Sequence, residues 1–143
     1  FIVVILVYYE YAHSITQNPG GTISELMMDA KSISSSLTTK GSPDDWNQSR
    51  VNIIGLTAGN QRIVHNKLDM FSNMAYSSSR TRLRTPYNYY FYLEELDGNP
   101  LLIGGKEGIG IHPGNSSDNI VSITRVVIYD SRLISMVVQV WEE

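Results

Sequence analysis

The 143-residue chain contains no cysteine, and this absence excludes several kinds of site at once. Without thiols there is no disulfide framework, no thiolate nucleophile and no cysteine-ligated metal. An excess of one charge is also lacking, because 11 Lys and Arg side chains are balanced by 14 Asp and Glu side chains, for a net charge of −3. A balance this close to neutral gives no reason to expect nucleic acid as a partner.

A hydrophobic run long enough to cross a membrane is missing too. Seven apolar residues, 1–7, open the chain, but an extension to Ile15 already includes Glu10 and His13. A membrane span needs about 20 apolar residues, and a secretory signal would carry a positive start and a small-residue cleavage site. We therefore expect these residues to rest in a membrane, to pack on other copies, or to belong to a longer element. A buried core helix or strand is the plainer alternative.

Motifs for catalysis and cofactor binding are not found either. The histidines at positions 13, 65 and 112 are far apart, so we expect no metal site. The glycine-rich stretch 104–110 lacks the Gly-Lys-Ser/Thr ending of a phosphate loop, and we interpret it as a hairpin loop. The adjacent pair 94–95, two glutamates on a predicted strand, would point to opposite faces, which disfavours paired acid–base carboxylates. We expect no enzyme and no cofactor, with a surface enzyme as the least favoured alternative.

What the chain does have is the composition of one globular domain. Its hydrophobic content is 42% and its mean hydropathy is −0.13, which argue against disorder. A chain of this length can bury one core. Two Asn-x-Ser sequons, at Asn47 and Asn115, lie in polar, turn-rich stretches and are candidate glycosylation sites of an extracytoplasmic protein.

Periodicity predicts helices first and strands afterwards. We expect a helix over 1–17, although its β-branched residues also permit a strand, and a break at 18–21. Helices follow over 22–39, opened by a capping box, and over 65–79. The polar face of the helix at 22–39 carries Asp29, Lys31, Ser32 and Ser36. Strands are predicted over 50–56, 87–96, 101–103, 119–129 and 133–141.

This order of elements predicts the fold class α+β. We expect an apolar N-terminal helix followed by a globular head with helices and a 4–5-stranded antiparallel sheet. The corresponding domains are an assembly helix over 1–17 and a head over 18–143.

Two side-chain clusters stand out in the predicted head. If residues 80–84 (Arg-Thr-Arg-Leu-Arg) are extended, three guanidinium groups line one side and suit an acidic partner, a glycan carboxylate or a neighbouring subunit; a solvated loop is the plainer alternative. Four of the nine tyrosines fall between 87 and 92. Tyrosines on both faces of a strand indicate that one face packs on the helices and the other is partly covered. A sheet edge closed by tyrosine is the competing account.

The arrangement resembles the type IV pilin superfamily, with the archaeal branch of class III signal peptide proteins as the nearer match. The resemblance is carried by the apolar stretch 1–11, the helical stretch 29–34 and the closing strands at 125–130 and 136–141. In that family a membrane peptidase cleaves the precursor, the N-terminal helix rests in the membrane, and assembly bundles these helices into a filament core.

The resemblance implies a structural subunit of an extracellular type IV pilus-like filament, a homo-oligomer that is membrane-inserted before assembly and serves adhesion or motility, with glycans as possible partners. A rod that binds a different surface of the next copy builds open fibres. The implied assembly interface consists of Phe1, Ile2, Val3, Val4, Ile5, Leu6, Val7, Tyr8, Tyr9 and Tyr11. The alternative function is a membrane-anchored extracytoplasmic binding or sensor domain.

Overall fold

The computed structural model describes residues 7–11, 19–114 and 119–142, and in these ranges the chain has an α+β fold. Three helices come early in the described chain: α1 (Pro19–Leu37), α2 (His65–Ser72) and α3 (Tyr76–Leu83). The strands are β1 (Val7–Tyr11), β2 (Asn88–Glu95), β3 (Pro100–Leu101), β4 (Ile109–Gly110), β5 (Ile120–Tyr129) and β6 (Arg132–Trp141). The predicted class of helices with an antiparallel sheet is confirmed for these residues.

The described strands form one antiparallel sheet in the order β1-β5-β6-β2-β3, and β4 also pairs with β2. The hairpin of β5 and β6 is its longest ladder, and Tyr129 and Arg132 are its last partners. Both turn residues have positive φ, 53° at Asp130 and 63° at Ser131. This turn geometry matches the twist of the flanking strands and fixes their register.

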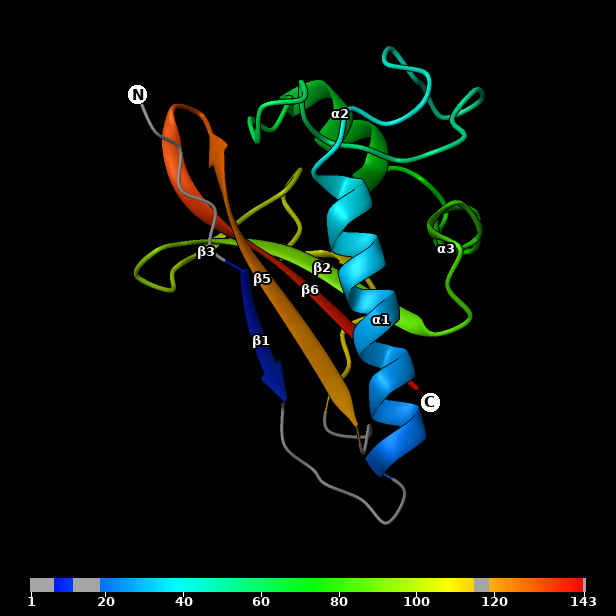
Figure 1. Cartoon of the computed structure of the whole chain (residues 1–143). Coiled ribbons are helices and arrows are strands. Elements are labelled where there is room, and N and C mark those ends of the chain that lie inside the picture. Colours follow the sequence, from blue (N-terminus) through cyan, green and yellow to red (C-terminus); the bar gives the residue numbers. More distant parts are fainter. Residues whose placement is uncertain (1–6, 12–18, 115–118, 143) are drawn as a thin grey trace.

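The core lies between one face of this sheet and the helices. Helix α1 lies across β5 and β6 (Figure 1), and its apolar residues recur every three or four positions, which places them on one side. β2 alternates as predicted. The hydrophobic core residues from these two elements are Leu26, Ala30, Ile33, Leu37, Tyr89, Phe91 and Leu93. Burying each such large side chain stabilises the fold by about 1.5–3 kcal/mol.

The N-terminal element differs from the helix predicted over 1–17. Val7–Tyr11 are a strand that pairs with the outer edge of β5, with Val7 opposite Arg125 and Tyr11 opposite Val121. Valine and tyrosine favour strands, and the open edge of β5 supplies the backbone partners that an isolated strand lacks. The remainder of the predicted helix, at 1–6 and 12–17, lies outside the described residues.

Helix α1 begins at Pro19, earlier than the predicted start at 22, so residues 19–21 do not form the predicted break. Proline is favourable at the first helical position, because its missing N–H has no intrahelical partner there. The helix predicted over 65–79 is also different, since it is two short helices. The N–H of Asn73 closes α2 on Asp69 O and Phe71 O, and Ala75 is extended before α3 begins.

The strand predicted over 50–56 is wrong. Among the described residues in this stretch, only Ile53 makes a β-bridge, with Ser42. Gly55 instead lies against Gly41, so closely that a Cβ on Gly55 would be 2.1 Å from the Gly41 nitrogen. The apolar side chains of Val51, Ile54 and Leu56 are buried by loop packing, without a ladder.

Candidate functional site

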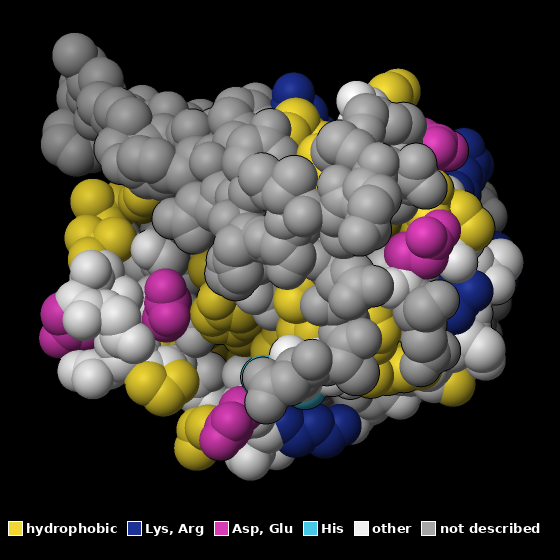
Figure 2. Space-filling model, turned by 90° about the horizontal axis from the view of Figure 1, so that it is seen from below, with side chains coloured by type: hydrophobic (Ala, Val, Ile, Leu, Met, Phe, Trp, Pro, Cys, Tyr) yellow, Lys and Arg dark blue, Asp and Glu magenta, His cyan; other side chains and the backbone are white. Residues whose placement is uncertain are grey.

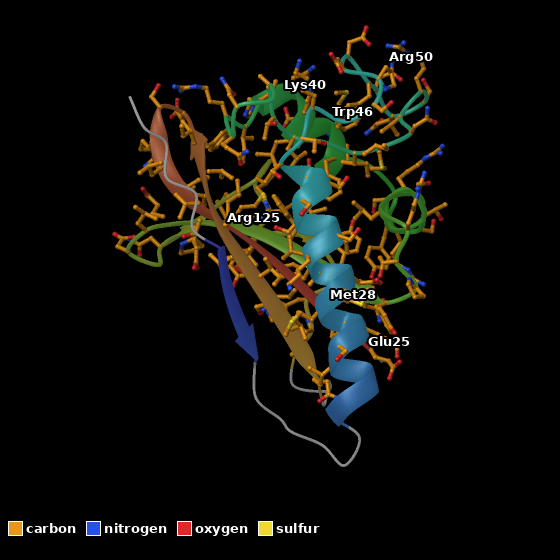
Figure 3. The ribbon with its side chains drawn as sticks, viewed as in Figure 1. Glu25, Met28, Lys40, Trp46, Arg50 and Arg125 are labelled. Carbon is orange, nitrogen blue, oxygen red and sulfur yellow. The ribbon has the colours of Figure 1, made fainter. Side chains whose placement is uncertain are left out.

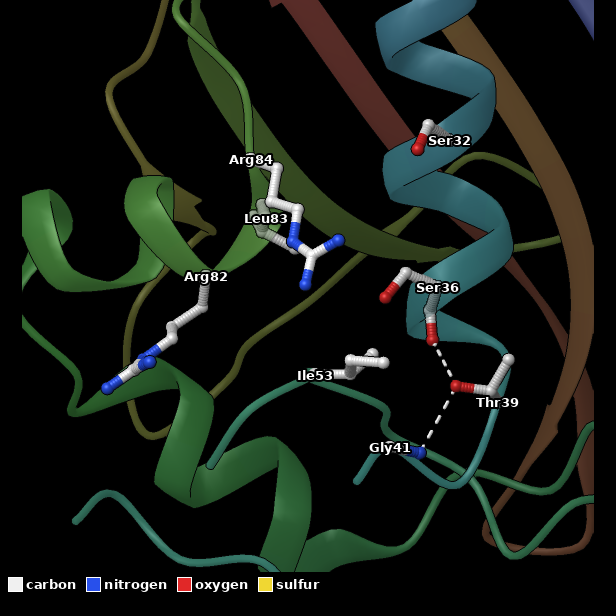
Figure 4. Close-up of a pocket in the computed structure, with 8 residues that line it drawn as sticks. All are labelled: Ser32, Ser36, Thr39, Gly41, Ile53, Arg82, Leu83 and Arg84. Atoms are coloured by element: carbon white, nitrogen blue, oxygen red, sulfur yellow. Dashed lines mark hydrogen bonds between the residues drawn. The ribbon is translucent and has the colours of Figure 1, made fainter. Parts of the chain in front are cut away.

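An open pocket of about 440 Å³ lies between α1, α3 and the loop that follows α1. Its lining residues come from these three segments and are Ser32, Ser36, Thr39, Gly41, Ile53, Arg82, Leu83 and Arg84. Figure 4 shows the Arg84 side chain extending into the space between α3 and α1, whereas the Arg82 side chain extends away from it. We call this feature the Arg84 pocket.

Arg84 ends α3 in an unusual backbone conformation. It is the C-cap, with φ 59° and ψ 42°, and its N–H bonds back to Arg80 O and Thr81 O. Glycine is the usual residue in this left-handed conformation, because any side chain there costs about 1–2 kcal/mol. The extended form predicted for 80–84 is therefore wrong, and the three arginines do not line one side.

A hydrogen-bond chain fastens the segment after Arg84 to α1. The Thr85 hydroxyl donates to Asp29 Oδ2 at 2.7 Å and accepts the N–H of Tyr87 at 3.1 Å. Thr85 is buried, so water competes weakly for these bonds. They hold Arg84 at a fixed distance from α1.

The other end of α3 is fastened to β2 by two tyrosines. The Tyr76 hydroxyl donates to Asn88 Oδ1 at 2.8 Å and accepts the Tyr89 N–H at 3.2 Å. The Tyr89 hydroxyl lies 2.5 Å from Ser79 Oγ on α3. Burial raises the pKa of Tyr89 from 10.0 to about 12. The α3 wall of the pocket is thus fixed to the central sheet by buried polar contacts.

The pocket wall on the α1 side is held in place by residues 56–57, which bond to the end of α1. Backbone N–H groups of Leu56 and Thr57 donate to Leu37 O at 2.9 Å and Thr39 O at 3.1 Å. The Thr57 hydroxyl donates to Thr38 O at 2.8 Å. These bonds satisfy carbonyl groups that the end of a helix leaves without partners.

Lys67 of α2 completes this capping arrangement. Its Nζ donates to Lys40 O at 2.7 Å and to Thr57 O at 3.0 Å, and the residue is 9% exposed. A cation is favourable at a helix C-terminus. Burial lowers the pKa of Lys67, while the nearby carboxylate of Asp44 raises it. These hydrogen bonds give Lys67 a structural role, because they join the end of α1 to Thr57.

Trp46 fills the loop between the end of α1 and residues 56–57, which bond to that end. Its indole Nε1 donates to Gly55 O at 2.8 Å, and its ring is buried. Figure 3 shows Lys40, Trp46 and Arg50 beyond the C-terminal end of α1. In the same view Arg125 of β5 lies beside α1, where its Nη2 donates to Ser35 Oγ at 2.8 Å.

A second hollow, of about 320 Å³, involves the other face of β2. Tyr90 and Tyr92 belong to its lining, and their ring centroids are 5.7 Å apart. The His112 ring meets the Tyr90 ring edge-on at 5.0 Å. Tyr90 is buried, so this tyrosine face is partly covered, as the sequence predicts.

The residues predicted to form the assembly interface fall in two groups. Val7, Tyr8, Tyr9 and Tyr11 belong to β1, whose backbone pairs with β5. The other predicted interface residues, at positions 1–6, lie outside the described residues.

Of the two predicted glycosylation sites, one lies within the described residues. Asn47 lies in a loop, where its Oδ1 accepts hydrogen bonds from Ser49 N at 3.0 Å, Ser49 Oγ at 2.8 Å and Arg50 N at 3.1 Å. Asn115 lies outside the described residues.

The two histidines in the described ranges, His65 and His112, each contact a tyrosine. His65 Nδ1 is 2.8 Å from the Tyr129 hydroxyl, and its Nε2 is 3.5 Å from Asp69 Oδ2. Within residues 7–11, 19–114 and 119–142, no group of three His, Cys, Asp or Glu side chains could hold a metal ion. His13 lies outside these ranges.

No helix in the described ranges combines the length and the apolar character needed to cross a bilayer. Comparison of the chain with protein-family models, with curated proteins and with solved structures finds no match in any of the three.

Proposed function

We propose that the chain is a structural subunit of an extracellular, type IV pilus-like filament, and that residues 1–17 hold neighbouring subunits together. The observation that carries the proposal is the run of seven apolar residues at 1–7, which precedes a folded α+β head. Burying each large apolar side chain contributes roughly 2 kcal/mol. Seven of them supply ample association energy, even after the cost of ordering the subunits.

The position of α1 supports this proposal. Its first turn lies at one end of the molecule, far from α2 (Figure 1). A helix that continued α1 beyond Pro19 would leave the head along the same axis, with a kink at the proline. α1 also has an outer surface free for neighbours, because Met28 is 70% exposed.

The end of the molecule at the first turn of α1 shows both apolar and charged side chains. Seen from below, described hydrophobic side chains are visible between the grey residues, and the Lys, Arg, Asp and Glu side chains in view lie mostly toward the outline (Figure 2). Protein interfaces commonly use such apolar side chains together with polar ones.

Assembly through an N-terminal helix requires a change in the paired segment. Val7–Tyr11 would have to leave the edge of β5 before they could join a helix bundle. A free edge strand attracts other strands, so the departing segment would have to be replaced by a neighbour. We infer that assembly exchanges the strand pairing of one subunit for contacts between subunits.

The test is negative-stain electron microscopy of the full chain, of a chain lacking residues 1–17, and of the variants Val4→Asp and Leu6→Asp. Val4→Ile and Leu6→Met are the matched controls, since they keep the apolar character. We expect filaments from the full chain and both controls. The Asp variants should give dispersed particles with an unchanged far-ultraviolet circular dichroism spectrum.

Filaments from the Asp variants would show that residues 1–7 do not assemble the polymer. If the full chain forms no filaments and sediments with membranes, the function would be that of a membrane-anchored binding or sensor domain.

A further inference from the structure

We propose that the Arg84 pocket binds an acidic sugar, with Arg84 holding the carboxylate and the hydroxyl groups of α1 holding the sugar hydroxyls. This ligand site goes beyond the filament proposal and does not depend on it. All the residues that line the pocket belong to one chain, so the site is complete without a second copy.

The backbone of Arg84 is the first indication. The described residues with positive φ other than glycine are Gln61, Arg84, Asp130 and Ser131. Asp130 and Ser131 form the hairpin turn of β5 and β6, whereas Arg84 lines a pocket. Glycine would adopt this conformation without strain. Strained residues persist where the rest of the structure holds them, and they concentrate at functional sites.

The guanidinium group of Arg84 is available to a ligand. Among the hydrogen bonds and ion pairs found in the described part of the chain, none engages the Arg84 side chain. The neighbouring Arg80, by contrast, donates to Pro86 O at 3.3 Å and lies over the Tyr76 ring. The planar donor fork of Arg84 points into the pocket (Figure 4), and this fork matches the two oxygens of a carboxylate.

The opposite wall of the pocket offers acceptors. Ser36 Oγ donates its hydrogen to Ile54 O at 3.0 Å, and Thr39 Oγ1 donates to Ser36 O at 2.7 Å. With their hydrogens engaged, both oxygens can only accept, and Ser36 Oγ is the freer acceptor because Thr39 Oγ1 already accepts the Gly41 N–H at 3.1 Å. A ligand therefore needs donors on the side facing α1 and a negative charge on the side facing α3. A sugar acid carries hydroxyl donors and a carboxylate on one ring.

The pocket suits a carboxylate better than a phosphate. It lies at the C-terminal ends of α1 and α3, where helix dipoles are negative and oppose a doubly charged group. Phosphate sites typically use the N–H groups of a helix N-terminus. The volume of about 440 Å³ is within the ordinary range for small-molecule sites.

The experiment is saturation-transfer difference NMR on the full chain with trigalacturonate as the probe. This method observes the ligand, so it works for dispersed and assembled protein alike. The neutral methyl ester of the same trisaccharide and a short acidic peptide, acetyl-Gly-Asp-Gly-amide, are the comparison ligands. We expect binding of the acid and at least about tenfold weaker binding of the other two.

Two variants with the same loss of charge locate the site. Arg84→Gln should weaken trigalacturonate binding at least about tenfold, because it removes a charged donor fork. Arg62→Gln is the matched control and should change binding less than twofold, since Arg62 is not among the residues that line the pocket. Arg84→Gly removes the same group while keeping the left-handed backbone, so its loss of binding cannot be attributed to misfolding.

Three results would overturn the proposal. They are no saturation transfer to trigalacturonate, equal losses from Arg62→Gln and Arg84→Gln, and peptide binding as strong as that of the sugar. The last would assign the pocket to a protein partner. Loss of filaments in the Val4→Asp variant would leave all these sugar measurements unchanged, so failures of the two proposals are distinguishable.

Discussion

Raising the pH should weaken the fold through one buried phenol, that of Tyr89. The ring is fully buried, and burial raises its pKa to about 12, against 10.0 for an exposed tyrosine. The neutral phenol thus favours the folded state, and this contribution is complete below pH 10. It is lost as the pH rises from 10 toward 12, because the unfolded chain releases the proton first.

The size of the effect follows from the two pKa values. A difference of about two between them corresponds to roughly 2.7 kcal/mol in total. Linkage gives a loss of about 1.4 kcal/mol by pH 11. At pH 8 the contact between Tyr89 and Ser79 should itself make the native chain more stable than Tyr89→Phe by about 1 kcal/mol. The native chain should therefore lose its advantage over the variant near pH 11.

The assay is urea unfolding of both proteins between pH 8 and 11, followed by the fluorescence of the buried Trp46 and Trp141. The difference between the two proteins isolates Tyr89, since Tyr87, Tyr90 and Tyr129, whose pKa values burial also raises, are present in both. A difference that stays constant over this range would refute the account of Tyr89.

Other substitutions test the pocket walls and the N-terminal strand. Arg84→Gly should raise the free energy of unfolding by about 1 kcal/mol, because glycine adopts the left-handed backbone without strain. Arg82→Gly, within α3, should lower the free energy of unfolding by about 1 kcal/mol. Thermal unfolding measures both, and shifts of the same sign would contradict the strain assigned to the positive φ of Arg84. Lys67→Met should destabilise the chain by roughly 2–3 kcal/mol, measured by urea unfolding, because it leaves two carbonyl groups without a hydrogen-bond donor. A loss below about 0.5 kcal/mol would mean that water replaces the amine. The double variant Tyr8→Cys with Thr124→Cys joins opposed residues of β1 and β5 at a separation that suits a disulfide. Microscopy should find filaments only after reduction, and filaments from the oxidised form would contradict release of β1.

The sheet could be predicted from sequence because its signals are local. Strict alternation marks β2, and two strand-like runs around the short turn at Asp130 and Ser131 mark β5 and β6. The stretch 50–56 has a similar apolar content, but its burial depends on Trp46 and Gly41, which approach it only in the folded chain. No local sequence pattern distinguishes apolar residues that are buried in a sheet from apolar residues that are buried by loop packing.

The pocket could be predicted only in part. The arginines at 80–84 are conspicuous in the sequence, but their periodicity does not reveal that Arg84 turns left-handed at the end of a helix. Pro86 is the available hint, because proline often follows a helix C-cap. Ser32 and Ser36 belong to the predicted polar face of α1. They line a pocket because Thr85 and Asp29 bring the end of α3 across that face, and this contact joins residues 56 positions apart.

The paired hydrogen bonds of Lys67 have a consequence for how the fold responds to redox conditions. By joining Lys40 O to Thr57 O, the amine closes a loop in the way that a covalent crosslink does in many exported domains. Here the closure needs no oxidant, no isomerase and no particular redox surroundings. The loop around Trp46 should therefore stay closed in reducing and in oxidising solution alike.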